Sequence, residues 1–170
     1  MRIFQRLLAW DRHAMRFYAL EDWLYRRGYE DLAYAVSAIS RLITGVEIEP
    51  GAEMAGARFL HGQGATIGAG ARVGEGTTIF QQVTLGRIAH SMDMDGYPTI
   101  GQNCYIYAGA RILGPITVGD DAKVAANALV TRDVPAGAIV SGNPARQVGW
   151  VEGYGKSAAQ PADPDEAATA

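Results

Sequence analysis

Residues 100–130 read IGQNCY IYAGAR ILGPIT VGDDAK VAANAL V, so that a branched aliphatic residue returns at every sixth position. The same period runs through residues 67–85, and a mostly small residue lies two positions before each aliphatic one. The aliphatic positions are Ile67, Val73, Ile79, Leu85, Ile100, Ile106, Ile112, Val118, Val124 and Val130. The positions two residues earlier are Ala65, Ala71, Thr77, Val83, Pro98, Cys104, Ala110, Ile116, Ala122 and Ala128.

A period of six fits neither the 3.6-residue period of a helix nor the two-residue alternation of an antiparallel strand. It fits a coil in which each hexad supplies one short strand and one corner, and three hexads complete a triangular turn. Successive turns then stack as parallel strands about 4.8 Å apart, with the aliphatic residues inside. We therefore predict a mainly β chain, folded as a left-handed parallel β-helix of hexapeptide repeats.

A short helical region is expected before the repeats, over residues 1–45. Apolar residues recur there at steps of four, three and four, and Gly28 interrupts the pattern, which predicts two short helices. Gly45 follows the second helix as a candidate C-cap. The recurring apolar residues are Leu32, Val36, Ile39 and Ile43.

The β-helix itself is expected over residues 46–150. Fifteen residues separate Leu85 from Ile100, so the period slips there, and we predict an extruded loop at 86–98. Residues 151–170 are small, polar and proline-bearing, which predicts a flexible tail.

The composition excludes several classes of partner. Of 170 residues 48% are apolar, and the formal net charge of -3 gives no broad basic field for nucleic acid. No apolar run approaches the roughly 18 residues of a membrane span. The single cysteine, Cys104, falls on a small inward position and is expected to fill space. The N-terminus lacks the pattern of a signal peptide, so a cytoplasmic protein is expected.

No metal is expected either. A zinc site would need about three converging histidines. The chain has only His13, His61 and His90, and His13 lies in the expected helical region.

Five segments carry a closer likeness, in a fixed order along the chain. They are ISRLITGVEIEPGA (39–52), FLHGQGATIG (59–68), IFQQVTLG (79–86), YAGARILGPITVG (107–119) and DVPAGAIVSGNPARQVG (133–149). Together they resemble the serine acetyltransferases of the hexapeptide acyltransferase superfamily. The resemblance implies an acetyl-CoA-dependent O-acetyltransferase that forms a homotrimer, in which acetyl-CoA lies between neighbouring coils and two chains share each active site. Family members with a longer helical region pair trimers into hexamers; only about 45 residues precede the coil here, so a trimer is the expected form and a hexamer the alternative.

The resemblance also implies the catalytic pair. An alcohol is a poor nucleophile until a base removes its proton during attack, and histidine suits that role near neutral pH. His61 aligns with the family's general base, and Glu47 with the carboxylate that orients it, usually an aspartate. Such a carboxylate fixes the histidine tautomer. The alternative is that His61 is a corner residue bonded to backbone and Glu47 a solvated charge.

For the coenzyme, the resemblance implicates backbone groups around Gly86, Ala108 and Ala126. Arg87 replaces a glycine that is usual in the family and would shift how the amide arm of the coenzyme sits. The candidate phosphate ligands are Lys123, Arg132 and Arg146. Cations favour phosphate contacts, although each of these is alternatively an ordinary surface charge.

The acceptor side departs from the family. Leu60 replaces an aspartate before His61, and Gly96 and Tyr97 replace an Arg-His pair that grips the serine carboxylate. The candidate substrate-binding residues are Leu60, His90 and Tyr97. Polar loop residues either substitute for the missing charges or are simply solvated; they are Arg87, His90, Asp93 and Asp95.

A zwitterion binds poorly where matching charges are absent. The expected acceptor is therefore serine or a serine-like small molecule, or alternatively a sugar, carrier-bound or secondary-metabolite hydroxyl. A noncatalytic β-helix scaffold is the third alternative. A family C-terminal isoleucine docks into a sulfhydrylase, whereas this sequence ends at Ala170, so no such complex is expected.

Overall fold

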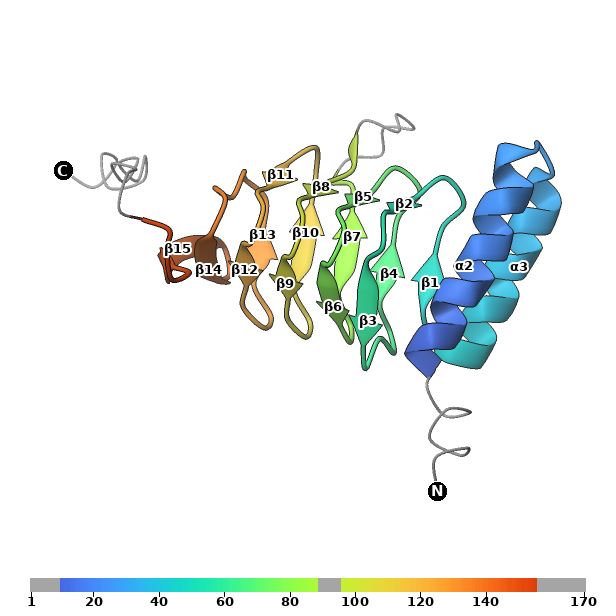
Figure 1. The fold of residues 1–170 in the computed structure, drawn as a ribbon, viewed down its shortest axis with the longest axis horizontal. Coiled ribbons are helices and arrows are strands. Elements are labelled where there is room, and N and C mark those ends of the chain that lie inside the picture. The colour runs from blue at the N-terminus through green and yellow to red at the C-terminus, as the bar shows by residue number, and fades with distance from the viewer. Residues whose placement is uncertain (1–9, 89–95, 156–170) are drawn as a thin grey trace, which may run out of the picture.

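The computed structural model describes residues 10–88 and 96–155, which form a helical hairpin followed by a parallel β-helix (Figure 1). The helices are α2 (Trp10–Arg26) and α3 (Glu30–Thr44). The strands are β1 (Glu47–Ile48), β2 (Glu53–Met54), β3 (Arg58–Leu60), β4 (Thr66–Ile67), β5 (Arg72–Val73), β6 (Thr78–Phe80), β7 (Thr84–Gly86), β8 (Thr99–Ile100), β9 (Tyr105–Ile106), β10 (Arg111–Leu113), β11 (Thr117–Val118), β12 (Lys123–Val124), β13 (Leu129–Val130), β14 (Ala138–Gly142) and β15 (Ala145–Trp150).

Three sheets form the sides of the coil, and most strands pair with the strands one turn before and after them. Sheet A has the order β1-β4-β7-β10-β13, sheet B the order β11-β8-β5-β2, and sheet C the order β15-β14-β12-β9-β6-β3. The pairings are parallel apart from that of β14 with β15, which is antiparallel and closes the coil. The predicted mainly β, parallel β-helix of hexapeptide repeats is confirmed.

The strand register places equivalent residues of successive turns above one another inside the coil. In sheet A, Ile67 pairs with Ile48 on one side and Leu85 on the other. All ten predicted aliphatic positions are at most 2% exposed, and the positions two residues earlier are buried as well. Each fully buried aliphatic side chain contributes about 1.5–3 kcal/mol. The hexad pattern therefore identified the core correctly.

The corners select residues that accept left-handed backbone angles. Gln82, Asn103, Asp121 and Asn127 have φ between 54° and 59°. Short polar side chains tolerate this region better than apolar ones. A different constraint applies at Gly74, where a Cβ atom would lie 2.6 Å from the backbone of the next turn.

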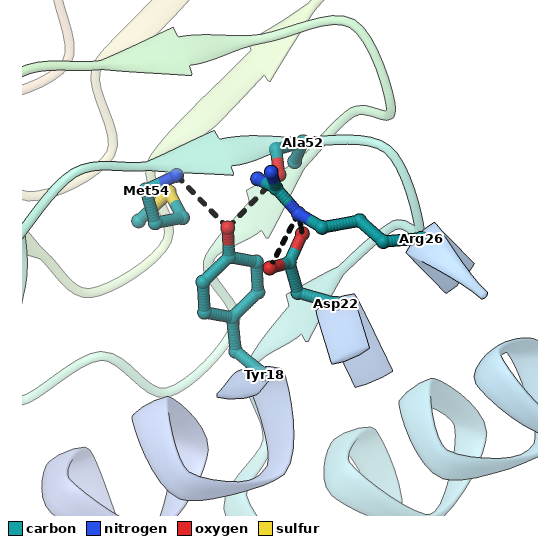
Figure 2. Close-up of polar contacts among 5 residues, drawn as sticks. All are labelled: Tyr18, Asp22, Arg26, Ala52 and Met54. Atoms are coloured by element: carbon teal, nitrogen blue, oxygen red, sulfur yellow. Dashed lines mark hydrogen bonds and ion pairs between the residues drawn. The ribbon is translucent and has the colours of Figure 1, made fainter. Parts of the chain in front are cut away.

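Tyr18 joins the helical hairpin to the first turn of the coil. Its hydroxyl donates to the carbonyl oxygen of Ala52 at 3.1 Å and accepts from the N–H of Met54 at 3.1 Å (Figure 2). One turn along α2, Arg26 pairs with Asp22 at 2.8 Å, as Figure 2 also shows. That exposed pair lies within α2 and contributes little, so of the contacts in Figure 2 those of Tyr18 join the helix to the coil.

The apolar stripe of α3 points away from the coil. The two predicted helices and the Gly45 C-cap, at φ 71°, are confirmed. However, Leu32, Ile39 and Ile43 are 47–56% exposed. The buried side chains of α3 are small, namely Ala33, Ser37, Ser40 and Thr44. Small side chains allow close approach, which lets Ser37 donate to the carbonyl oxygen of Ile48 at 2.6 Å.

Glu21 is a buried carboxyl group in α2. It is 1% exposed, and among the described residues its Oε1 atom has no hydrogen-bond partner. Burial raises the pKa of Glu21 to about 8, and the nearby Asp22 charge adds to the rise, while Ser37 opposes it. The carboxyl group is therefore protonated in the folded protein through neutral pH.

The last described residues continue past β15. The hydroxyl of Tyr154 donates to Asp121 at 2.6 Å, and the N–H of Val151 donates to the carbonyl oxygen of Gly137 at 2.8 Å. Residues 151–155 thus lie against the final turn, beyond the point where we predicted a flexible tail to begin. Residues 156–170, and 89–95 of the predicted loop, lie outside the described residues.

Substituting Gly74→Ala will destabilise the coil, because the new methyl group meets backbone of the neighbouring turn that cannot move aside. We expect a loss of about 1–3 kcal/mol in the free energy of unfolding, measured by urea denaturation. Gly149→Ala is the control, since the nearest atom to its Cβ lies 4.0 Å away. Equal effects of the two substitutions would contradict the close approach.

Glu21 should make stability depend on pH. Its folded pKa of about 8 lies above the ordinary 4.5, so the folded state holds a proton that the unfolded state has lost between these values. Stability therefore falls as pH rises through this window, by at most about 1.4 kcal/mol per pH unit. Glu21→Gln should flatten the profile and exceed the parent in stability at pH 8.5. Parallel profiles for the two proteins would refute the assignment; Glu152→Gln, at an exposed site, is the control.

Candidate functional site

His61 lies at an enlarged corner between β3 and β4. The register pairs Phe59 with Ile79 and Ile67 with Leu85, yet eight residues lead from Phe59 to Ile67 and six from Ile79 to Leu85. Because the strands on both sides keep their register, the two additional residues are accommodated at the corner. His61 is exposed there, with φ 56°.

Gly62 makes this corner possible. A Cβ atom on Gly62 would lie 2.8 Å from the Cβ of Phe59, which is a buried core residue. The chain must therefore turn tightly over Phe59 immediately after His61. The result is a histidine held on a left-handed corner by packing beneath it.

Glu47 lies at the same corner, one turn earlier. The N–H of Gly64 donates to the carbonyl oxygen of Gly45 at 2.7 Å, and the N–H of Glu47 donates to that of Ala65 at 2.9 Å. The corner carrying His61 is thus stacked on the start of β1. The Glu47 carboxylate accepts from Arg41 Nη1 at 3.0 Å and makes no hydrogen bond to His61 in the described structure. The pairing of Glu47 with His61 stays a prediction.

The corners between sheets C and A form what we call the histidine edge, residues 61–65, 81–83, 108–110 and 125–128. Backbone hydrogen bonds align them: Gln82 N–H donates to Gln63 at 3.0 Å and Asn127 N–H to Ala108 at 2.9 Å. Of the predicted site residues, this edge brings together His61, Ala108 and Ala126.

The corners between sheets A and B form a second edge, which we call the loop edge: residues 68–71, 86–88, 96–98, 113–116 and 131–133. It carries the predicted residues Gly86, Arg87, Tyr97 and Arg132. The Arg87 guanidinium lies 5.7 Å from the centre of the Tyr97 ring, and that ring packs directly on Gly68. Sheet A separates this edge from His61 within one chain. His90 lies outside the described residues.

The other predicted residues lie outside the two edges, although Leu60 and Lys123 lie beside the histidine edge. Leu60 and Lys123 are on the outer face of sheet C, where Lys123 Nζ lies 5.8 Å from the centre of the Tyr105 ring. Arg146 is in β15 at the end of the coil and donates to the carbonyl oxygen of Ala145. The three candidate phosphate ligands are therefore not gathered at one place in the described chain.

Cys104 behaves as the sequence predicted. It is fully buried in its hexad position, and its Sγ lies 3.2 Å from the carbonyl oxygen of Gly119. Burial raises the pKa of the thiol to about 11, so it is not a nucleophile at neutral pH. Among the described residues no group of three metal-ligating side chains occurs, and no helix is long and apolar enough to cross a membrane.

The sequence analysis missed three features near His61. Arg41 pairs with Glu47, as described above. Gln81 buries its Oε1 atom without a hydrogen-bond partner in the described part of the chain. Phe80 and Tyr107 lie together on sheet C, with ring centres 5.1 Å apart. Phe80 directly follows the inward residue Ile79, and Tyr107 directly follows Ile106, so this pair could have been predicted from the hexads.

The family model for bacterial transferase hexapeptide (six repeats) matches residues 97–132. A serine acetyltransferase of Mycobacterium tuberculosis is 41% identical over 138 residues, which make up 81% of this chain and 60% of the relative. One from Helicobacter pylori strain 26695 is 39% identical over 137 residues, 80% of each chain.

Solved structures give the same result. The crystal structure of serine acetyltransferase from Vibrio cholerae superposes with a TM-score of 0.83 at 35% identity, over 85% of this chain and 56% of that one. A Brucella abortus serine acetyltransferase in complex with coenzyme A gives 0.81 at 37% identity, over 84% and 57%. The chain thus spans little more than half the length of these structures. The match to the Helicobacter relative over four-fifths of both sequences shows that the chain belongs to the serine acetyltransferase family.

Proposed function

We propose that the protein transfers the acetyl group of acetyl-CoA to the hydroxyl of serine or a serine-like small molecule, with His61 as general base. The observation that carries this proposal is the exposed corner at His61, which is two residues longer than the corner stacked on it, within a family whose relatives are named serine acetyltransferases. A noncatalytic scaffold would have no need of a strained histidine corner held over Phe59.

The proposed reaction moves one proton and exchanges one bond. The imidazole of His61 takes the hydroxyl proton as the oxygen attacks the thioester carbon. The new C–O bond replaces the C–S bond, and the proton passes to the leaving thiolate. Glu47 is the proposed partner that holds the histidine tautomer, which requires its carboxylate to turn from Arg41 toward His61.

Acetyl-CoA fits the histidine edge by its chemistry. Ala108 and Ala126 have small side chains, and Ala126 is exposed, so backbone groups there are accessible to an extended amide arm. Lys123 lies beside this edge on sheet C and is the proposed phosphate contact. Gly86, Arg87 and Arg132 lie on the loop edge and would contact a ligand held by a different chain.

This division supports a homotrimer as the working form. His61 and the residues Arg87 and Tyr97 lie on opposite edges of sheet A, so one ligand reaches both sets most simply between two neighbouring chains. The exposed apolar side chains on α3, such as Leu42 at 83%, likewise favour an assembly over an isolated chain. We further propose the cytoplasm as its location, because the one cysteine is unpaired, as is usual in reducing compartments.

Replacing His61 should abolish turnover without unfolding the protein. His61→Asn is the preferred variant, because asparagine tolerates the φ of 56° while lacking a base. We expect kcat to fall by about 10²–10⁴-fold in a thiol-release assay with acetyl-CoA and serine. Asn103→Asp, at another left-handed corner, should keep full activity. Retained turnover in His61→Asn would eliminate the mechanism.

The proposed role of Glu47 can be distinguished from its observed ion pair with Arg41. If Glu47 orients His61, Glu47→Gln should lower kcat by about 10–100-fold with little change in the KM for acetyl-CoA, and Glu47→Asp should restore part of the rate. Arg41→Ala removes only the ion pair seen here and should leave kcat within about twofold. If Glu47→Gln and Arg41→Ala have the same small effect on kcat, Glu47 is a surface charge.

A further inference from the structure

The outer face of sheet C carries an apolar surface that ends at His61. Leu60 pairs in register with Phe80, and Tyr107 follows the pair of Ile79 with Ile106, so these three side chains lie on successive strands. Phe80 and Tyr107 are 5.1 Å apart between ring centres, and Tyr105 and Tyr107 6.2 Å apart. We call Leu60, Phe80, Tyr105 and Tyr107 the aromatic ledge.

The ledge borders the histidine edge along its length. Leu60 immediately precedes His61, and Tyr107 immediately precedes Ala108. Two strand spacings separate Leu60 from Tyr107, about 10 Å, which is the length of a small-molecule body. Leu60 is 43% exposed and Tyr105 36%, so the surface is open in the chain. An acceptor whose hydroxyl reached His61 would have its remaining atoms beside these side chains.

The charged side chains on this face are cationic, namely Arg58, two residues before Leu60, and Lys123, and strands β3, β6, β9 and β12 carry no carboxylate that could pair with an ammonium group. Arg58 Nε donates to Thr78 Oγ1 at 2.9 Å, and Lys123 lies over the Tyr105 ring at the far end of the ledge. A free amino acid has both an ammonium and a carboxylate beside its hydroxyl, and desolvating them against leucine and phenylalanine is costly. A neutral acceptor avoids this cost and gains apolar burial.

Gln81 adds a polar requirement. It follows Phe80 at the histidine edge, and its buried Oε1 atom accepts no hydrogen bond in the described residues. This oxygen has no exposed surface, so a ligand N–H or O–H group reaches it only if the Gln81 side chain turns outward, a movement that the new hydrogen bond would favour. The site therefore favours a ligand with an apolar body and at least one neutral donor.

We propose that the aromatic ledge binds the body of a hydroxyl acceptor whose amino and carboxyl groups are neutralised, as in a serine unit linked through amide bonds, with Gln81 accepting one of its N–H groups. This inference rests on the proposed acetyl transfer and names the class of acceptor. The ledge is a binding surface, and the chemistry remains that of His61.

The test compares three acceptors in the thiol-release assay: L-serine, N-acetyl-L-serine methylamide and N-benzoyl-L-serine methylamide. The second removes charge alone, and the third adds an apolar ring. We expect kcat/KM to rise at least about tenfold from serine to the benzoyl compound. Tyr107→Ala should reduce the value for the benzoyl compound at least about fivefold more than the value for serine, without raising the KM for acetyl-CoA.

Two control variants distinguish loss of the aromatic ledge from loss of the fold. Tyr107→Phe keeps the ring and should keep the preference, and Val148→Ala removes an exposed apolar side chain from β15 without effect. Binding of the benzoyl compound to the His61→Asn protein, measured by equilibrium dialysis, should be lost in the double variant with Tyr107→Ala.

Each outcome is decisive. Preference for free serine that Tyr107→Ala does not alter overturns the inference and leaves the proposed function standing. A raised KM for acetyl-CoA in Tyr107→Ala assigns the ledge to the coenzyme, and dissociation of the oligomer in that variant assigns it to a subunit contact; both overturn the inference. Absence of thiol release with all three acceptors overturns the proposed function itself.

Discussion

Backbone hydrogen bonds between successive turns are the constraint on which the rest of this molecule depends. Thr66 N–H reaches the carbonyl oxygen of Val83 at 2.9 Å, and Thr84 N–H reaches that of Ala110 at 3.0 Å. These bonds fix the turns about 4.8 Å apart and convert a six-residue period into straight columns. Residues far apart in sequence, such as His61 and Ala126, are thereby brought onto one edge with no side-chain contact needed to align them.

The same constraint decides where the chain can vary. Strands of two or three residues with fixed register cannot absorb an extra residue, because their buried side chains would change faces. Additional residues are therefore confined to corners, as at His61 and between Leu85 and Ile100. Variation at corners leaves the core intact, and two of the places where the spacing departs from six residues, at His61 and between Leu85 and Ile100, also carry functional candidates.

The sequence was sufficient to predict which residues form the core, but it was not sufficient to predict which side chains meet on the surfaces. A strict period identified Ile67, Ile112 and the other inward residues, because burial in this fold depends on position within the hexad. Periodicity also located α3, but it could not show that Leu32 and Ile43 face outward. That orientation follows from the close approach of Ser37 to the coil.

Contacts that depend on how the helices and strands pack together could not be predicted from the sequence pattern either. The ion pair of Arg41 with Glu47 depends on how α3 leads into β1. The burial of Glu21 depends on the packing of two helices against the coil. The contact of Phe80 with Tyr107 depends on register, which the hexads do contain, so that feature was predictable from the repeat.

The division between backbone and side chains also separates the features that the coil requires from those that it leaves free to vary. At the histidine edge, aligned backbone groups and small residues such as Ala108 follow from the coil itself, and a coenzyme held there is recognised by features that the fold already requires. The aromatic ledge, in contrast, consists of outward side chains that lie outside the buried core. Substitution at Leu60 or Tyr107 leaves the inward column of Phe59, Ile79 and Ile106 unchanged. Residues on this face can therefore change while the coil and its histidine corner are retained.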